Sequence, residues 1–380
     1  MDFLHRTWAE IDLDALIHNF LNIKSAVPDK KLFAVVKADA YGHGTEPIVT
    51  ALKNNGADAF AVSNIEEALA VRQIAQDADI LILGYTPPEK ADVLANNNIT
   101  QAVYSLKFAT DLSFAAKDKQ VQIKAHLKVD TGMGRLGFDL RTDNLLGIDE
   151  LLDTYKLEGL NIEGIFTHFA ASDRDGDSDA QFTNAQFDRF CRCIDIIKEA
   201  GYNAGICHCS NSAALLLDKD KRLDALRPGI ILYGLNPTET HADLIPVMTL
   251  KSVVSFIKEI EEGQTVNYGK SYTATRKTRV ATIPAGYADG YPRLLSNKGY
   301  VLIKGQKANI IGKVCMDQLC VDITDLEGIS EGNEVILFGK ELPAKELADM
   351  IGTIHYELVC GITKRVPRII VKGNQNNERN

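Results

Sequence analysis

One lysine, Lys37, ends an apolar, β-favouring run in the stretch LFAVVKADAYGHG (residues 32–44), and Tyr41 follows it. A lysine that leaves a buried strand at the rim of a pocket can act as a nucleophile, because a desolvated amine condenses with carbonyl groups. A lysine that ends a strand in solvent is the commoner case, since lysine is mostly exposed in proteins. The rest of the chain must decide between a reactive amine and a solvated strand end.

Other polar residues and one glycine occupy the corresponding position, at or just after an apolar run. They are Lys128, Asp130, Arg135, His168, Asn211, Ser212, Arg227 and Gly229. Each has an ordinary explanation when taken alone: a single histidine is more often a hydrogen-bonded core residue, and a glycine often marks a turn. The repeated position favours a functional site, because groups at successive strand ends of a barrel converge in space.

The segments near Ser212 and Gly229 suit a phosphate group. Ser212 stands where a helix is expected to begin, and the backbone amides of Gly229 and Ile230 can donate hydrogen bonds. A phosphate site, a lysine and several cationic groups on one rim indicate a phosphorylated cofactor that Lys37 holds as a Schiff base.

The elements that would position these residues repeat along residues 32–234, where a β-rich run is followed each time by a helical pattern. The runs are LFAVVKA, AFAVSN, DILILG, QAVYS, IKAHLKVD, IEGIFTHF, GICHC and ALRPGIILYG. Strands that alternate with helices pair in parallel, so the sequence predicts an α/β fold with an N-terminal (β/α)8 TIM barrel. An open doubly wound sheet is the alternative, and the absence of a GxGxxG motif after the first run weakens it.

The pattern changes after the barrel to alternating strands broken by Gly and Asn turns, which predicts a mainly antiparallel C-terminal β domain. We expect a barrel over residues 13–240, a β domain over 241–372 and a flexible tail over 373–380. The opening RTWAEIDL also alternates, so residues 1–12 are expected to add a strand to the β domain.

Composition excludes several classes of protein. The chain has 380 residues, 24% of them charged, and a net charge of −9 without a basic cluster, which argues against nucleic acid as a partner. Neither a signal peptide nor a membrane-spanning run is present, so a cytoplasmic protein is expected. The seven cysteines lack zinc-site spacing and are interpreted as free thiols, with no metal site.

The chain also resembles a known protein family. The blocks AVVKADAYGHG, KVDTGMGRLGF, THFA, NSAA, RPGIILYG, VNYGKSYTA, PAGYADGYPR, GKVCMDQ and HYELVCGITKRVPR are similar, in this order, to the motifs of bacterial alanine racemases. The similarity runs from TWAEIDLDALIHN almost to the C-terminus. It implies a barrel and a β domain, as the pattern of elements does independently.

The resemblance implies pyridoxal 5′-phosphate (PLP) as the cofactor, bound to Lys37. The phosphate would be held by Tyr41, Ser212, Gly229, Ile230 and Tyr356. His168 would pack at the cofactor ring, and Arg227 would face the pyridine nitrogen. No metal is implied.

The resemblance also implies a racemisation of L-alanine and D-alanine through an external aldimine, with two bases, Lys37 and Tyr268. Arg135 and the backbone of Met316 would bind the substrate carboxylate. Lys128 matches a lysine that often carries a carbamate in the family. The product D-alanine would serve peptidoglycan synthesis.

The remaining implied residues, Tyr287 and Asp317, lie with Tyr268 and Met316 in the β domain. In the family such residues reach the cofactor of a second subunit, so a head-to-tail homodimer with shared sites is implied, although closure within one chain is an alternative. Tyr287, Tyr356 and Met316 would leave room for a methyl side chain. A serine or broad-specificity racemase is the nearest competing function. A PLP-dependent decarboxylase, a PLP carrier and a sugar-phosphate enzyme are more distant ones.

Overall fold

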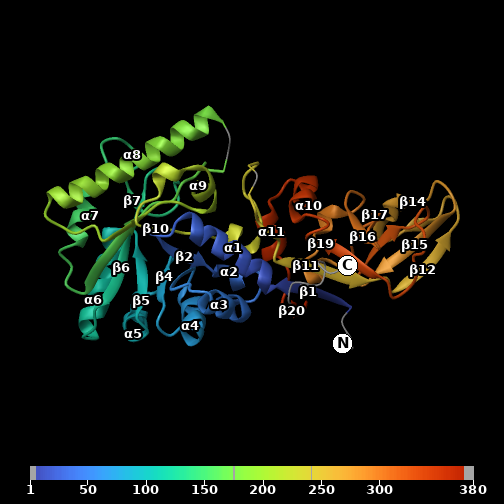
Figure 1. The fold of residues 1–380 in the computed structure, drawn as a ribbon, viewed down its shortest axis with the longest axis horizontal. Coiled ribbons are helices and arrows are strands. Elements are labelled where there is room, and N and C mark those ends of the chain that lie inside the picture. Colours follow the sequence, from blue (N-terminus) through green and yellow to red (C-terminus); the bar gives the residue numbers. More distant parts are fainter. Residues whose placement is uncertain (1–5, 174–175, 241, 372–380) are drawn as a thin grey trace.

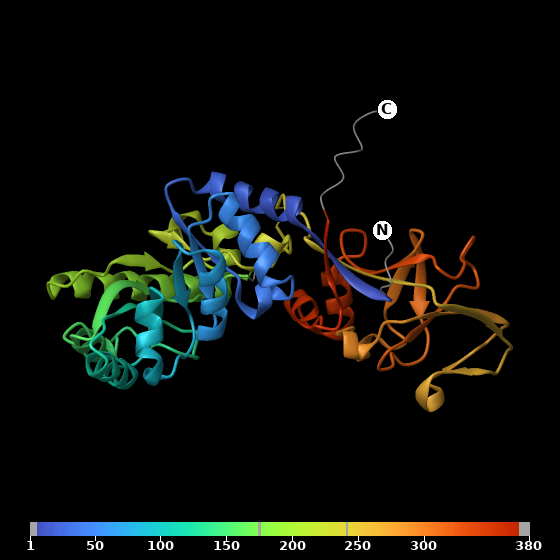
Figure 2. The same ribbon diagram turned by 90° about the horizontal axis from the view of Figure 1, so that it is seen from below.

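The computed structural model describes residues 6–173, 176–240 and 242–371, and the expected tail at 373–380 lies outside them. Two bodies lie side by side along the longest axis of the molecule (Figures 1 and 2). The first contains the parallel strands with their helices, and the second contains most of the antiparallel strands. The predicted fold class is confirmed.

Eight parallel strands form a closed barrel, because the first strand of the series pairs with the last and every neighbouring pair is parallel. The strands are β2 (Lys31–Val35), β3 (Ala59–Val62), β4 (Asp79–Ile82), β5 (Ile99–Val103), β6 (Ile123–Asp130), β8 (Leu160–Phe166), β9 (Ile206–His208) and β10 (Ala225–Leu226). A short strand, β7 (Phe138–Asp139), adds to β6. All four residues of β3 are buried, as expected for a strand that is covered on both faces.

Helices cover the outside of the barrel. They are α1 (Leu13–Ala26), α3 (Thr45–Asn54), α4 (Ile65–Ile74), α5 (Ala91–Asn96), α6 (Leu106–Asp118), α7 (Ile148–Thr154), α8 (Asp177–Glu199) and α9 (Ser212–Leu217). Polar residues start several of them: the side chains of Asn64, Ser105 and Asn211 accept hydrogen bonds from the first-turn amides of α4, α6 and α9. The loops that lead into these helices are thereby fixed.

The second body is built on a sheet of nine strands. Its order is β12 (Phe256–Ile260), β15 (Thr278–Ile283), β18 (Leu319–Asp322), β17 (Gln306–Ile310), β16 (Tyr300–Ile303), β19 (Glu334–Phe338), β11 (Met248–Val253), β1 (Thr7–Asp12) and β20 (Arg368–Val371). The N-terminal β1 lies between β11 and β20 and is parallel only to β20. From β1 the chain therefore leaves this sheet, crosses to the barrel and returns.

Shorter elements complete the second body. A two-stranded ribbon joins β13 (Thr265–Val266) to β14 (Tyr272–Thr273), and the helices α10 (Ala344–Ile351) and α11 (His355–Cys360) pack together. Sequence patterns predict α10 but not α11, because HYELVC is rich in β-favouring residues and carries no helix cap.

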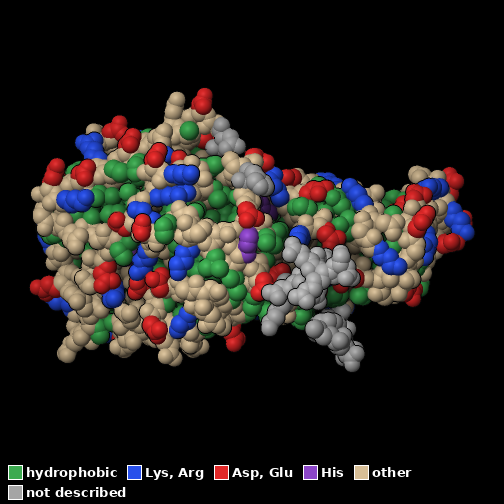
Figure 3. Space-filling model, viewed as in Figure 1, with side chains coloured by type: hydrophobic (Ala, Val, Ile, Leu, Met, Phe, Trp, Pro, Cys, Tyr) green, Lys and Arg blue, Asp and Glu red, His purple; other side chains and the backbone are tan. Residues whose placement is uncertain are grey.

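The surface is mixed in charge. Lys and Arg side chains are interspersed with Asp and Glu on the face that Figure 3 shows. Within the described part of the chain, no helix has both the length and the apolar character of a membrane span.

Candidate active site

A cavity of about 700 Å³ lies at the carboxyl ends of the barrel strands. It brings together the barrel residues that the sequence predicts for a site, with the exception of Asp130, and two residues of α11, Tyr356 and Cys360. Its predicted lining residues are Lys37, Tyr41, Lys128, Arg135, His168, Ser212, Arg227, Gly229, Ile230 and Tyr356. The convergence expected from their repeated position is therefore present.

The sequence predicts that Lys37 ends its strand. In the structure Lys37 instead begins the turn that follows the strand. Strand β2 ends at Val35, and the segment α2 (Lys37–Tyr41) continues with four residues, Ala38–Tyr41, whose φ angles are 52–54°. This left-handed turn is held by its surroundings: Glu67 accepts a hydrogen bond from the Ala38 amide (2.7 Å), and Asp39 accepts one from the Thr45 amide (2.8 Å). The turn places both Lys37 and Tyr41 in the cavity wall.

Three polar groups meet at one end of the cavity: the amide of Gly229 and the hydroxyls of Ser212 and Tyr41. The Gly229 amide donates a hydrogen bond to Ser212 Oγ (2.8 Å). A Cβ atom on Gly229 would lie 2.7 Å from the Tyr41 hydroxyl and 3.6 Å from Ser212 Oγ. Any side chain at position 229 would fill the space between these hydroxyls, so glycine keeps a small polar cradle open.

A buried chain of hydrogen bonds lies behind this cradle. Arg227 contacts Nδ1 of His208 at 2.7 Å and Nδ1 of His168 at 3.3 Å, and His208 Nε2 lies 2.9 Å from Nδ1 of His126. Because a guanidinium only donates, both Nδ1 atoms facing Arg227 must accept, and the neutral rings of His168 and His208 carry their protons on Nε2. Burial, and next the Arg227 charge, hold the pKa of both histidines well below the ordinary value.

His126 and His208 are functional candidates that the sequence analysis did not single out. His126 lies inside β6, away from the strand-end position that identified the others. His208 is the last residue of β9, but the sequence pattern drew attention to Asn211 and Ser212, which follow that strand. The signal was available in part, since His126 and Lys128 are two residues apart in β6 and must point to the same side.

The cavity is positively charged. Burial, and next the charge of Arg135, lower the pKa of Lys37. Burial, with Arg135 and Arg227, lowers the pKa of Lys128 to about 8. Burial lowers the pKa of Arg227 to about 10, so its guanidinium stays charged at neutral pH. Cationic groups so close together favour an anionic ligand.

Apart from Tyr356, the predicted residues of the β domain lie elsewhere in the same chain. Tyr268, Met316 and Asp317 line a separate shallow hollow that shares no residue with the barrel cavity. The side chains of Tyr268 (74% exposed), Met316 (52%) and Tyr287 (42%) are all open to solvent. The single chain therefore does not bring the two predicted bases, Lys37 and Tyr268, into one cavity.

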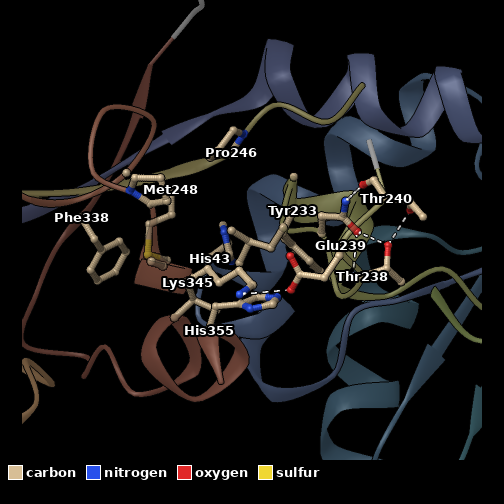
Figure 4. Close-up of a pocket in the computed structure, with 17 residues that line it drawn as sticks. His43, Tyr233, Thr238, Glu239, Thr240, Pro246, Met248, Phe338, Lys345 and His355 are labelled. Carbon is tan, nitrogen blue, oxygen red and sulfur yellow. Dashed lines mark hydrogen bonds and ion pairs between the residues drawn. The ribbon is translucent and has the colours of Figure 1, made fainter. Parts of the chain in front are cut away.

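A further cavity of about 410 Å³ lies between the two bodies (Figure 4). His43, Tyr233, Met248, Phe338 and His355 line it, and it also has no lining residue in common with the barrel cavity.

Comparison with known proteins gives the same family over both bodies. The family model of the alanine racemase N-terminal domain matches residues 11–237, and that of the alanine racemase C-terminal domain matches residues 247–370. The chain belongs to the alanine racemase family. It is therefore an enzyme of a racemase family, as its sequence motifs predict.

Individual members of the family are similar over almost their whole length. Alanine racemase of Clostridium perfringens (strain SM101 / Type A) is 44% identical over 376 residues, which cover 97% of this chain and 96% of the relative. The structure of alanine racemase from Clostridium difficile 630 is 40% identical with a TM-score of 0.90, covering 98% and 97% of the two chains.

One further structure of the family bears on the cofactor. It is alanine racemase from Bartonella henselae with covalently bound pyridoxal phosphate, which is 32% identical to this chain. The TM-score is 0.88, and the similarity covers 97% of this chain and 100% of that one.

Proposed function

We propose that this family member interconverts L-alanine and D-alanine, with PLP bound covalently to Lys37. The observation that carries the proposal is the cavity itself: a lysine with a lowered pKa, several cationic groups and the polar cradle at Gly229 line one space. The Bartonella henselae relative, which binds pyridoxal phosphate covalently, supports the same cofactor here.

The residues present fit this cofactor. The phosphate would lie in the cradle, where the hydroxyls of Tyr41 and Ser212 and the amide of Ile230 can donate hydrogen bonds and Tyr356 lines the same cavity. The Gly229 amide would exchange its hydrogen bond to Ser212 Oγ for one to the phosphate. Arg227 would face the pyridine nitrogen. Because a guanidinium cannot give up its proton readily, this nitrogen would stay unprotonated. His168, held by Arg227, would pack at the ring.

PLP, when bound, supplies an electron sink that makes the Cα proton of an amino acid removable. Racemisation then requires one base on each face of Cα. Lys37 Nζ would take the proton of D-alanine, and its lowered pKa makes the neutral, basic amine available at lower pH than in an ordinary lysine. Tyr268 Oη would take the proton of L-alanine.

A tyrosine hydroxyl is a weak base at neutral pH unless its anion is stabilised. His168 can provide this stabilisation, because Arg227 occupies its Nδ1 and leaves an Nε2–H to donate. In one chain Tyr268 is remote from this histidine, so we propose that a second copy brings it in a head-to-tail homodimer. The exposed side chains of Tyr268 and Met316 in the single chain support this arrangement.

Arg135 and the Met316 amide would bind the substrate carboxylate, and Asp317 would support the loop that carries Met316. Lys128 would position Arg135 as a carbamate. Its pKa of about 8 supports this role, since the neutral amine is the form that adds to carbon dioxide with release of a proton. Tyr287, Tyr356 and Met316 would limit the substrate to a small side chain. The cytoplasmic location and the supply of D-alanine for peptidoglycan stay predictions.

The test is to incubate the purified protein with PLP and L-alanine, L-serine or L-lysine, and to measure each D-enantiomer by chiral chromatography. We expect D-alanine to form fastest, with little D-serine and no D-lysine. Faster conversion of serine would favour the serine racemase alternative. Release of carbon dioxide without any D-amino acid would contradict a racemase and favour a decarboxylase.

A further inference from the structure

The turn that follows Lys37 is strained. Its residues Ala38–Tyr41 all have φ angles of 52–54°, and none of them is glycine. A left-handed conformation costs roughly 1–2 kcal/mol for each such residue, because Cβ crowds the next carbonyl group. A strained turn persists only where its surroundings over-determine it, and such turns cluster at functional sites. The question is which group holds the end of the turn that carries Tyr41.

His43 is in the position to do so. Its side chain is fully buried, and its Nδ1 lies 3.0 Å from the carbonyl oxygen of Ala40 and 2.9 Å from that of Tyr41. Burial lowers the pKa of His43 to about 4, so the ring is neutral at neutral pH and carries one N–H. Both neighbours of Nδ1 are carbonyl oxygens, which only accept, so the proton belongs on Nδ1 and is shared between them.

The same ring also packs against an aromatic neighbour, whereas its Nε2 has no hydrogen-bond partner among the described residues. The ring centroids of His43 and Tyr233 are 4.5 Å apart, and those of Tyr233 and Tyr41 are 4.9 Å apart. Figure 4 shows His43 and Tyr233 side by side in the wall of the cavity between the two bodies. The Tyr233 hydroxyl donates to the carbonyl oxygen of Val35 (3.1 Å), the last residue of β2. His43, Tyr233 and Tyr41 thus form one buried aromatic layer that is bonded to the segment before and after Lys37.

His43 itself does not line the active-site cavity, whereas Tyr41 does. We propose that His43 is a positioning residue for the cofactor: its Nδ1–H holds the left-handed turn so that the Tyr41 hydroxyl stays in the phosphate cradle. The inference rests on the proposed function, since the cradle matters only if it holds a phosphate. It concerns how the cofactor is retained rather than which reaction is catalysed.

Two substitutions separate the hydrogen bonds from the bulk of the ring. His43→Asn places an amide N–H₂ at the same number of bonds from Cβ as Nδ1, and His43→Leu has similar reach without a donor. We expect His43→Leu to weaken PLP binding by about tenfold, the equivalent of one lost hydrogen bond to a buried carbonyl, and His43→Asn to recover most of it. The control is His18→Leu, which removes a half-exposed histidine of α1 and should change nothing.

The readout that distinguishes positioning from general destabilisation is the ratio of the affinities for PLP and for pyridoxal, which lacks the phosphate. His43→Leu should lower this ratio. In a Tyr41→Phe background the same substitution should lower the ratio little further, because both changes remove the same hydroxyl–phosphate contact. An unchanged ratio, or additive losses in the double variant, would overturn the inference.

If His43→Leu does not fold, neutron diffraction on crystals of the wild-type holoenzyme provides the test. A deuteron on Nδ1 of His43 supports the inference, and a deuteron on Nε2 alone contradicts it. A wild-type protein that takes up no PLP would instead contradict the proposed function and this inference together. Tight PLP binding in the wild type with no effect of His43→Leu would contradict the inference alone.

Discussion

Lys128 lies among cationic neighbours in the active-site cavity, and this has a consequence for stability that depends on pH. Its pKa is about 8 in the folded protein, compared with the ordinary value of 10.5. Below pH 8 the amine is charged in both states, and the folded state carries the cost of a buried charge. Between pH 8 and 10.5 the folded protein releases the proton first, so this cost disappears as the pH rises.

We therefore predict that Lys128→Met raises the melting temperature of the cofactor-free protein at pH 7, in buffer free of carbon dioxide, and that this gain shrinks as the pH approaches 10.5. Thermal unfolding followed by circular dichroism at several pH values measures it. Lys107→Met, at an exposed lysine of α6, is the control and should show no such trend. A gain in melting temperature that does not change with pH would contradict a lowered pKa of Lys128 in the folded protein.

Functional residues could be predicted where they occupy the same position after successive strands of the barrel. Lys37, Ser212 and Arg227 each follow a strand of the barrel, and topology alone brings such positions to one rim. His43 and His208 were not singled out, because their importance lies in contacts with residues far along the chain or in an unusual turn. Nothing in KADAY indicates four successive left-handed residues, since none of them is glycine.

At the scale of elements, two loops of the β domain form one unit around a buried carboxylate. Asp289 is 1% exposed and pairs with Arg6 (2.5 Å) and Arg365 (3.1 Å). It closes the turn η5 (Tyr287–Asp289) by accepting from the Gly286 amide (2.9 Å). The amides of Tyr287 and Ala288 donate to the carbonyl oxygens of Cys315 and Met316, both at 3.0 Å. Asp289 thus fixes Tyr287 relative to Met316.

We predict that Asp289→Asn destabilises the protein by about 2 kcal/mol, because the buried side chain loses its charge-assisted hydrogen bonds to two partly exposed arginines. In the same variant the KM for alanine should rise more than kcat falls, since Tyr287 and Met316 shape the substrate end of the proposed site. Urea unfolding and steady-state kinetics measure the two effects. Asp325→Asn removes an exposed partner of Arg276 and should change neither; equal effects of both variants would count against a special role of Asp289.

The main elements were predictable because the hydrophobic pattern changes period between the two bodies. The alternation of β-rich runs with helical patterns gives the barrel, and the short strands β9 and β10 were found because they follow the same repeat. The turn at Tyr268–Lys270 and the helix α11 were not predicted, since tertiary packing outweighs the local preference of their residues.

At the scale of the whole molecule, the proposal requires two chains for each active site, because Tyr268 lies outside the barrel cavity of its own chain. This predicts complementation between two inactive variants. Lys37→Ala removes the lysine of the barrel, and Tyr268→Phe removes the tyrosine of the β domain. In a head-to-tail heterodimer both changes fall in one site, and the other site is intact.

Co-expression of the two variants in equal amounts should therefore restore about one quarter of the wild-type racemase activity, because half of the dimers are mixed and each has one intact site. Each variant expressed alone is the control and should show no racemase activity with L-alanine as the substrate. Activity no higher than that of the single variants would contradict shared sites and favour closure within one chain.

The measurement that tests the central claim most directly is reduction of the PLP-loaded protein with borohydride, followed by peptide mass mapping. Reduction converts an imine between the cofactor and a lysine into a stable amine. We predict the phosphopyridoxyl group on Lys37 and none on Lys128, the second lysine of the cavity with a lowered pKa. A label on Lys128, or no labelled lysine at all, would contradict the proposed active site.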